Sequence, residues 1–131
     1  MTLSIASVPN GTVTSPKGFS AGGIFAGIKT PGADKKDIGL LYSERACAIA
    51  GTFSQNSILS PTVTLDRERV GTDKKIHAVV VNSGCANTAV GDQGLIDAKE
   101  MTDITAAHLG VTSEQTLVSS TGVIGVEIPM A

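Results

Sequence analysis

The sequence contains few aromatic and few charged residues. Aromatic residues make up 3% of the chain and tryptophan is absent, while charged residues make up 17% and give a net charge of -2. Proteins that bind nucleic acid neutralise phosphates with clusters of Lys and Arg, and many stack bases on aromatic rings. This sequence has neither a basic cluster nor a set of aromatic residues, which excludes nucleic acid as its main partner.

Cysteine and histidine are equally scarce. Cys47, Cys85, His77 and His108 are the only residues of these types, and their spacing matches no zinc motif. Two isolated cysteines do not form a disulfide framework and are typical of reduced thiols. The sequence also shows no signal peptide and no run of about 20 apolar residues. We therefore expect a cytoplasmic protein with no membrane contact, no metal and no bound cofactor.

Hydrophobic residues and glycines are abundant. The 131 residues are 41% hydrophobic and include 15 glycines, which predicts one domain, residues 1–131, rich in strands and tight turns. The glycine-rich residues 18–29 predict a strand, and residues 38–42 with 47–53 predict a buried hairpin. We expect a short helical turn at 55–60, a strand at 62–65 and, in the charged residues 66–75, a solvated turn.

The second half of the chain has the pattern of a β-α-β unit. Residues 77–81 and 116–120 predict strands on either side of a helix at 93–109,. The helix should begin after Asp92 and end at Gly110, and its apolar face should consist of Leu95, Ala98, Met101 and Ile104. The fold class is therefore α/β. In such units functional residues gather at the carboxyl ends of the strands.

A polar, glycine-containing segment follows each of these strands, at residues 82–87 and 119–125. In the second, Thr121 offers a hydroxyl and Gly122 a backbone N–H, the pair of donors that a developing oxyanion needs. The alternative is that both segments are ordinary turns, since Ser, Thr, Asn and Gly are common in turns. A phosphate-binding loop is a further alternative, although neither segment has dinucleotide or P-loop spacing.

Other reactive side chains have simpler interpretations. Cys85 would need a nearby base to act as a nucleophile, and His77 and His108 are expected at the far ends of their elements. Lys29 is interpreted as a strand-end residue and Asp92 as a helix cap.

Four segments together resemble the glutamate N-acetyltransferase family, also called ornithine acetyltransferase. The glycine-rich residues 18–29 are similar to its N-terminal strand pair, and AGTFSQN at 50–56 is similar to its AGVFTxN segment. VNSGCAN at 81–87, followed by GDQG, resembles VNSGNAN and GxxG. STGVIG at 120–125, followed by IPM at 128–130, resembles STGVIGxxLPM. Order and spacing agree from Gly18 to Met130.

The resemblance implies an enzyme of arginine biosynthesis that moves an acetyl group from N-acetylornithine to glutamate; some members also use acetyl-CoA as a substrate. It implies mixed sheets in a layered αββα arrangement built from an α and a β chain, which arise by autocatalytic cleavage. The acetyl group is carried on the threonine that becomes N-terminal on the β chain. Thr121 and Gly122 match the family's oxyanion-hole pair.

The resemblance also identifies what this sequence lacks. The cleavage motif KGAGMIAPxMAT and its threonine nucleophile are absent, so residues 1–131 match the N-terminal part of the α chain. We expect the remainder of the α chain and the β chain to be its partners, and this chain alone to be inactive. Cys85 stands where the family usually has Asn. A self-processing amidase or aminopeptidase of related fold, or a non-catalytic interaction fragment, is the alternative.

Overall fold

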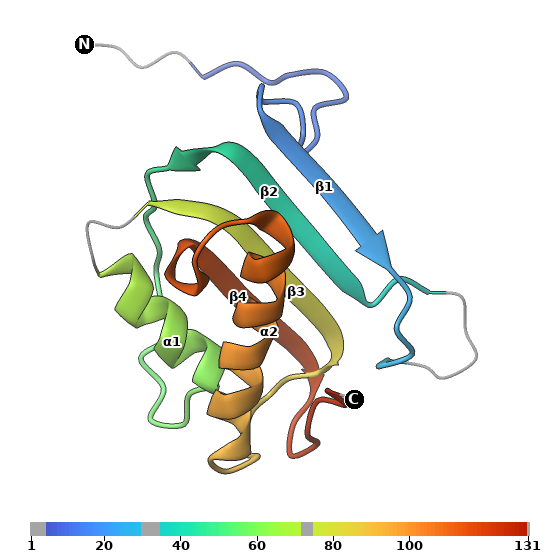
Figure 1. Cartoon of the computed structure of the whole chain (residues 1–131), viewed down its shortest axis with the longest axis vertical. Helices are drawn as coiled ribbons and strands as arrows, with labels where there is room; N and C mark the ends of the chain where they lie inside the picture. The colour runs from blue at the N-terminus through green and yellow to red at the C-terminus, as the bar shows by residue number, and fades with distance from the viewer. Residues whose placement is uncertain (1–4, 30–34, 72–74, 131) are drawn as a thin grey trace.

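The computed structural model describes residues 5–29, 35–71 and 75–130. Within these residues the elements, in chain order, are β1 (Phe19–Ile24), β2 (Ile38–Cys47), α1 (Pro61–Val70), β3 (Ile76–Cys85), α2 (Gln93–Leu109), the 3-10 turn η1 (Ser113–Gln115) and β4 (Thr116–Val123). The strands form one mixed sheet in the order β1-β2-β3-β4 (Figure 1). The first three strands pair antiparallel, whereas β4 runs parallel to β3.

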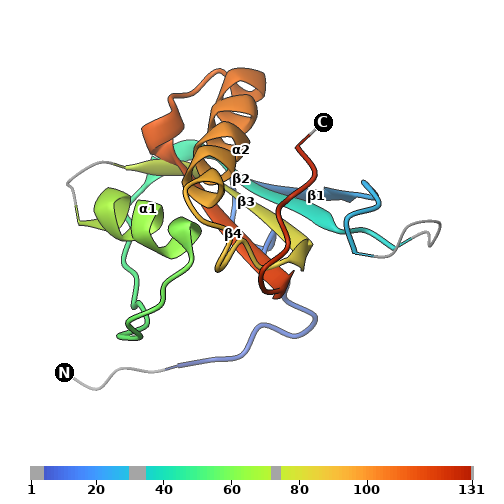
Figure 2. The same cartoon turned by 90° about the horizontal axis from the view of Figure 1, so that it is seen from below.

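Both α-helices of the described residues lie on one face of the sheet (Figure 2). The core between helices and sheet is a cluster of buried side chains: Leu65, Val80, Cys85, Ala98, Met101, Val118 and Ile128. On the opposite face the register places Leu41, Val79 and Leu117 in one row across β2, β3 and β4. One face of the sheet is therefore covered by helices, and the other presents an apolar row.

The predicted β-α-β unit is confirmed. Helix α2 has the predicted bounds, and it ends at Gly110, whose φ of 69° is the left-handed conformation that terminates helices,. Two details of the prediction are wrong. Leu95 and Ile104 are 38% and 47% exposed, because the face that packs on the sheet is formed by small and polar residues beside Ala98 and Met101. Asp92 makes no side-chain cap hydrogen bond.

The predicted hairpin at 38–42 and 47–53 is wrong. Residues 38–47 form one continuous strand, β2, which pairs with β1 on one side and β3 on the other. The register shifts between Tyr42 and Cys47, where the Ser43 hydroxyl donates to the Arg45 carbonyl at 2.7 Å. The polar residues that suggested a turn form this irregularity instead.

Helix α1 replaces the predicted strand at 62–65 and part of the predicted solvated turn at 66–75. Pro61 occupies the first turn of the helix, where a missing N–H costs nothing. Thr62, Leu65 and Arg69 are buried, whereas Arg67 and Glu68 are exposed, so one side of the charged stretch faces the protein and the other faces water. Residues 72–74 of the predicted turn lie outside the described residues.

Candidate active site

The parallel pairing of β3 and β4 brings the two glycine-containing segments side by side. Ser83 pairs with Thr121, Gly84 with Gly122, and Cys85 with Val123. Both strands continue through these residues, so the prediction that the strands end before them is wrong. The proximity of the two segments follows directly from the parallel register.

Gly84 and Gly122 allow the backbones to approach closely. Their φ angles are 134° and 137°, a region that side chains rarely adopt. A Cβ on Gly122 would collide with the carbonyl of Gly84 and come within 2.8 Å of the Cys85 amide nitrogen. A Cβ on Gly84 would come within 2.8 Å of the backbone of Ile28 and Lys29. Three backbone segments therefore approach one another closely at this point, and the Cγ2 atom of Ile28 also lies beside Gly84.

Asp37 holds the outermost of these segments in place. Its buried carboxylate accepts hydrogen bonds from the N–H of Ala26 at 2.7 Å and of Lys29 at 3.1 Å. Burial alone would raise the pKa of Asp37, but the backbone donors outweigh it and hold the pKa below the usual value of 3.8. Sequence analysis did not identify Asp37, and the chain segment that it fixes follows β1 rather than the site strands.

Two buried asparagines shape the backbone next to the site. Asn82 donates to the Cys85 carbonyl at 3.0 Å, and Asn87 donates to the Gly94 carbonyl at 2.7 Å. Both side chains are fully buried. Asn87 has a φ of 51°, which Asn tolerates better than most residues. The Asn82 bond shapes the end of β3, and the Asn87 bond connects the segment after β3 to the start of α2.

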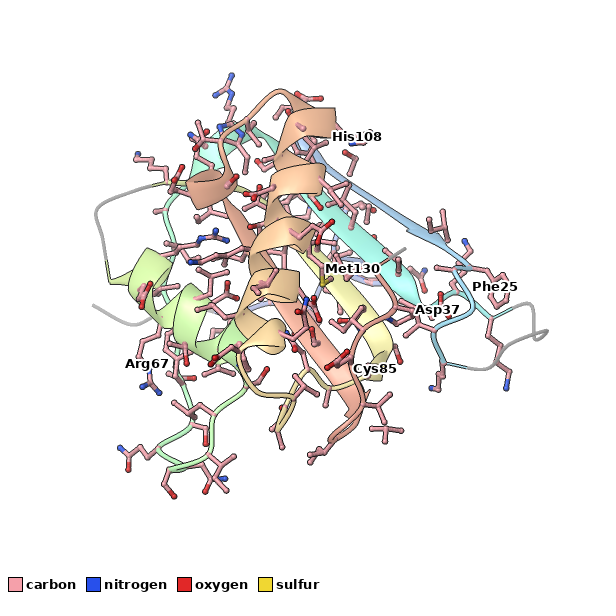
Figure 3. The ribbon with its side chains drawn as sticks, turned by 60° about the horizontal axis from the view of Figure 1, so that its bottom comes forward. Phe25, Asp37, Arg67, Cys85, His108 and Met130 are labelled. Atoms are coloured by element: carbon pink, nitrogen blue, oxygen red, sulfur yellow. The ribbon has the colours of Figure 1, made fainter. Side chains whose placement is uncertain are left out.

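Cys85 lacks the surroundings of a nucleophile. Its side chain is buried, and burial raises the pKa of its thiol, which disfavours the reactive thiolate. His108 lies at the opposite end of α2 from Cys85 (Figure 3). His77 donates a hydrogen bond through Nδ1 to the Ser43 carbonyl, 2.9 Å away.

The backbone of β4 is open on the side away from β3. The Val118 N–H donates to Asp66 and the Thr116 carbonyl accepts from Arg69, both on α1. The Val123 carbonyl accepts from Ala86 on the β3 side. Because backbone groups alternate sides along a strand, these bonds direct the N–H of Gly122 to the open side.

A cavity of about 360 Å³ lies against this open edge. Its lining comes from α1, from the loop before it, from the segment after β3, and from β4 with the residue that follows it: Phe53, Ser60, Thr62, Val63, Asp66, Ala86, Thr88, Val118, Ser119, Ser120, Thr121, Gly122 and Ile124. Thr121 is exposed and is one of the lining residues. The structure thus brings Thr121 and Gly122 together at a pocket, next to a carboxylate, Asp66, that the sequence analysis placed on a solvated turn.

The described residues hold no group of three or more metal-ligating side chains. No helix in the described part of the chain is long and apolar enough to cross a membrane. The sheet, the crossover helix and the hydroxyl-lined pocket define the class of this molecule, an α/β protein with a candidate oxyanion site at a strand edge.

Comparison with known proteins identifies the family. The sequence matches the ArgJ family over residues 20–131, and the chain belongs to that family. It is 43% identical over 131 residues to the arginine biosynthesis bifunctional protein ArgJ of Dehalococcoides mccartyi, covering 99% of this chain and 32% of that protein. It is 48% identical over 120 residues to the ArgJ protein of Symbiobacterium thermophilum, covering 92% of this chain and 30% of the relative.

Solved structures agree with this assignment. The ArgJ structure from Bacillus halodurans superposes with a TM-score of 0.88 at 36% identity, over 94% of this chain and 63% of that one. The ornithine acetyltransferase of Mycobacterium tuberculosis, solved in complex with ornithine, gives a TM-score of 0.83 at 35% identity, over 90% of this chain and 63% of the other. The chain spans about a third of the length of the curated relatives that it matches.

Proposed function

We propose that this chain supplies the oxyanion hole of an acetyltransferase of arginine biosynthesis, which moves an acetyl group from N-acetylornithine to glutamate. The observation that carries the proposal is the open edge of β4. There Thr121 and Gly122 line one cavity, and the close approach of the β3 and β4 backbones at Gly84 and Gly122 supports a fixed position for the two donors.

The chemistry requires two such donors. The acetyl group passes through an ester with a threonine that lies outside this chain. When an amine attacks the ester, the carbonyl oxygen gains negative charge in a tetrahedral intermediate. Donors that are already in position stabilise this charge without reorganising, and loss of one such donor typically costs about 3 kcal/mol of transition-state stabilisation.

The proposal includes a larger assembly. The threonine nucleophile, which would be generated by autocatalytic cleavage, and most substrate contacts come from the remainder of the α chain and from the β chain. The row of Leu41, Val79 and Leu117 lies on the face of the sheet without helices, with Leu117 buried and the other two half-buried. It is suited to packing against a second sheet, which would complete an αββα arrangement. This chain alone is then inactive, and acetyl-CoA serves the complete enzyme only as an alternative substrate.

The acyl-enzyme itself provides the test. The full-length protein is incubated with N-acetylornithine without glutamate, and its chains are analysed by mass spectrometry. We expect a mass increase of one acetyl group on a chain that begins with threonine, and loss of that group when glutamate is added. Transfer without any acetylated intermediate would contradict the proposed mechanism.

A further inference from the structure

Two charged side chains of α1 form hydrogen bonds with the backbone of the first half of β4, on its outer edge. The Arg69 guanidinium donates to the Thr116 carbonyl at 2.5 Å, and the Asp66 carboxylate accepts from the Val118 N–H at 3.1 Å. Arg69 also donates to the Thr102 hydroxyl on α2 at 3.1 Å. The two side chains are three residues apart and so share a face of the helix. They therefore satisfy successive outward-facing residues of β4.

The side-chain hydrogen bonds from α1 to β4 end before the candidate oxyanion site. Asp66 lines the same cavity as Thr121 and Gly122. The next outward-facing residue after Val118 is Ser120, whose hydroxyl is buried and has no hydrogen-bond partner among the described residues. Asp66 is thus the last side chain shown to hydrogen-bond to the outer edge of β4 before Gly122. A displacement of about 1 Å at such donors can cost on the order of a hundredfold in rate.

We propose that Asp66 is a positioning residue for acetyl transfer: through Val118, its carboxylate sets the direction of the Gly122 N–H and the place of the Thr121 hydroxyl. The inference rests on the proposed role of these two residues. It assigns to α1 a function in the reaction, although the helix contributes neither donor.

The protonation of Asp66 gives this role a pH signature. Burial raises the pKa of Asp66 to about 6, against the opposing effects of the Val118 hydrogen bond and the Arg69 charge. Besides Asp66, the carboxylates that interact with the Arg69 charge are Glu114 on η1, Asp103 on α2 and Glu68 on α1. The hydrogen bond to Val118 is charge-assisted only above this pKa, and such bonds are roughly twice as strong as neutral ones.

The raised pKa of Asp66 has opposite effects on the proposed positioning role and on the stability of the fold. Since the folded protein binds this proton more tightly than the unfolded chain does, stability falls as pH rises from the unfolded value of 3.8 through about 6,. A carboxylate that reduces stability at neutral pH is typical of a residue retained for function.

The test uses the full-length protein with Asp66→Asn, Asp66→Ala and, as a matched control, Glu68→Gln, which removes an exposed carboxylate from the same helix. Transfer from N-acetylornithine to glutamate is measured from pH 5 to pH 8, together with thermal unfolding. We expect Asp66→Asn to lose the step in kcat near pH 6 and to stay several-fold below the parent at pH 8, with KM little changed. Asp66→Asn should also unfold at a higher temperature at pH 8. Asp66→Ala should lose about tenfold or more in kcat, and Glu68→Gln should behave like the parent.

Two results would overturn the inference. One is an Asp66→Asn variant with parental kcat that keeps the step near pH 6. The other is a loss of kcat in Asp66→Ala that only follows a loss of folded protein. If the Ala variant does not fold, the pH profile of the Asn variant decides. Failure of the oxyanion proposal itself is recognised separately, by normal turnover when Thr121 is replaced.

Discussion

Gly84 and Gly122 occupy paired positions on β3 and β4, and the carbonyl of Gly84 fills the space that a Cβ on Gly122 would need. Alanine at Gly122 would require β3 to move, and alanine at Gly84 would require the segment of Ile28 and Lys29 to move. The contact connects the two segments that carry the candidate site. Glycine is required at both positions because a side chain would collide with the neighbouring backbone and because the φ angles are positive.

Substitution of Gly122 should therefore damage both fold and activity. Gly122→Ala combines a φ of 137° with a backbone collision, and we expect it to lower the free energy of unfolding by about 2–4 kcal/mol. Gly125→Ala is the matched control, because Gly125 also has a positive φ, 79°, but no atom lies within 4 Å of the added Cβ. Denaturant unfolding of the full-length variants measures the difference. Equal losses in the two variants would show that the close approach is unimportant.

Replacement of Thr121 tests the donor rather than the backbone. Thr121→Ala removes the hydroxyl of an exposed residue and leaves the Gly122 N–H, so the full-length protein should fold normally. Its rate of acetyl transfer should fall on the order of a hundredfold, which corresponds to about 3 kcal/mol. Thr121→Ser keeps the hydroxyl and should lose much less. Steady-state kinetics with N-acetylornithine and glutamate measure both, and near-normal turnover in the Ala variant would make Thr121 a simple strand residue.

Asp37→Asn should destabilise the fold in a pH-dependent way. The folded pKa of Asp37 is lowered, so its contribution to stability is present above the unfolded value of 3.8 and is lost as pH falls through the folded pKa. Thermal unfolding at neutral pH should show a melting temperature several degrees below the parent, and the difference should shrink below about pH 4. Asp92→Asn, at an exposed carboxylate without a cap hydrogen bond, is the control and should show no such difference. A constant deficit at every pH would contradict this role of Asp37.

The uncovered face of the sheet should make the isolated chain associate. Leu41 and Val79 are half-buried on the face without helices, beside the buried Leu117, and exposed apolar patches drive association. Size-exclusion chromatography with light scattering should show oligomers, and Val79→Lys should reduce them. Ile58→Lys, which changes a 73% exposed residue in a loop, should not. A monomeric parent chain with a cooperative melt would argue against a missing covering layer.

The sequence predicted the elements whose pattern is local. Helix α2 was placed correctly because its apolar period and Gly110 are both visible in the chain, and the neighbouring strands followed from their apolar runs. Helix α1 was missed because its residues alternate hydroxyl, apolar and charged side chains. Its position depends on contacts between Asp66 and Arg69 and a strand far along the chain.

Only part of the candidate site could be predicted from the sequence, because only part of it depends on a local pattern. Thr121 and Gly122 could be selected from composition and motif, whereas their pairing with Ser83 and Gly84 is a property of the parallel register. Asp37 gave no signal, since a single carboxylate before a strand is common. Its role depends on N–H groups of a segment from another part of the fold.

The parallel arrangement of β3 and β4 has a consequence for how the chain folds. β3 and β4 pair only after the whole of α2 has closed the loop between them, and parallel pairing across a long crossover forms slowly. The antiparallel strands β1 and β2 need no such closure. The pairing of Ser83 with Thr121 is therefore expected among the last contacts to form, and a partly folded chain would contain the first strands of the sheet without any of the geometry that binds an oxyanion.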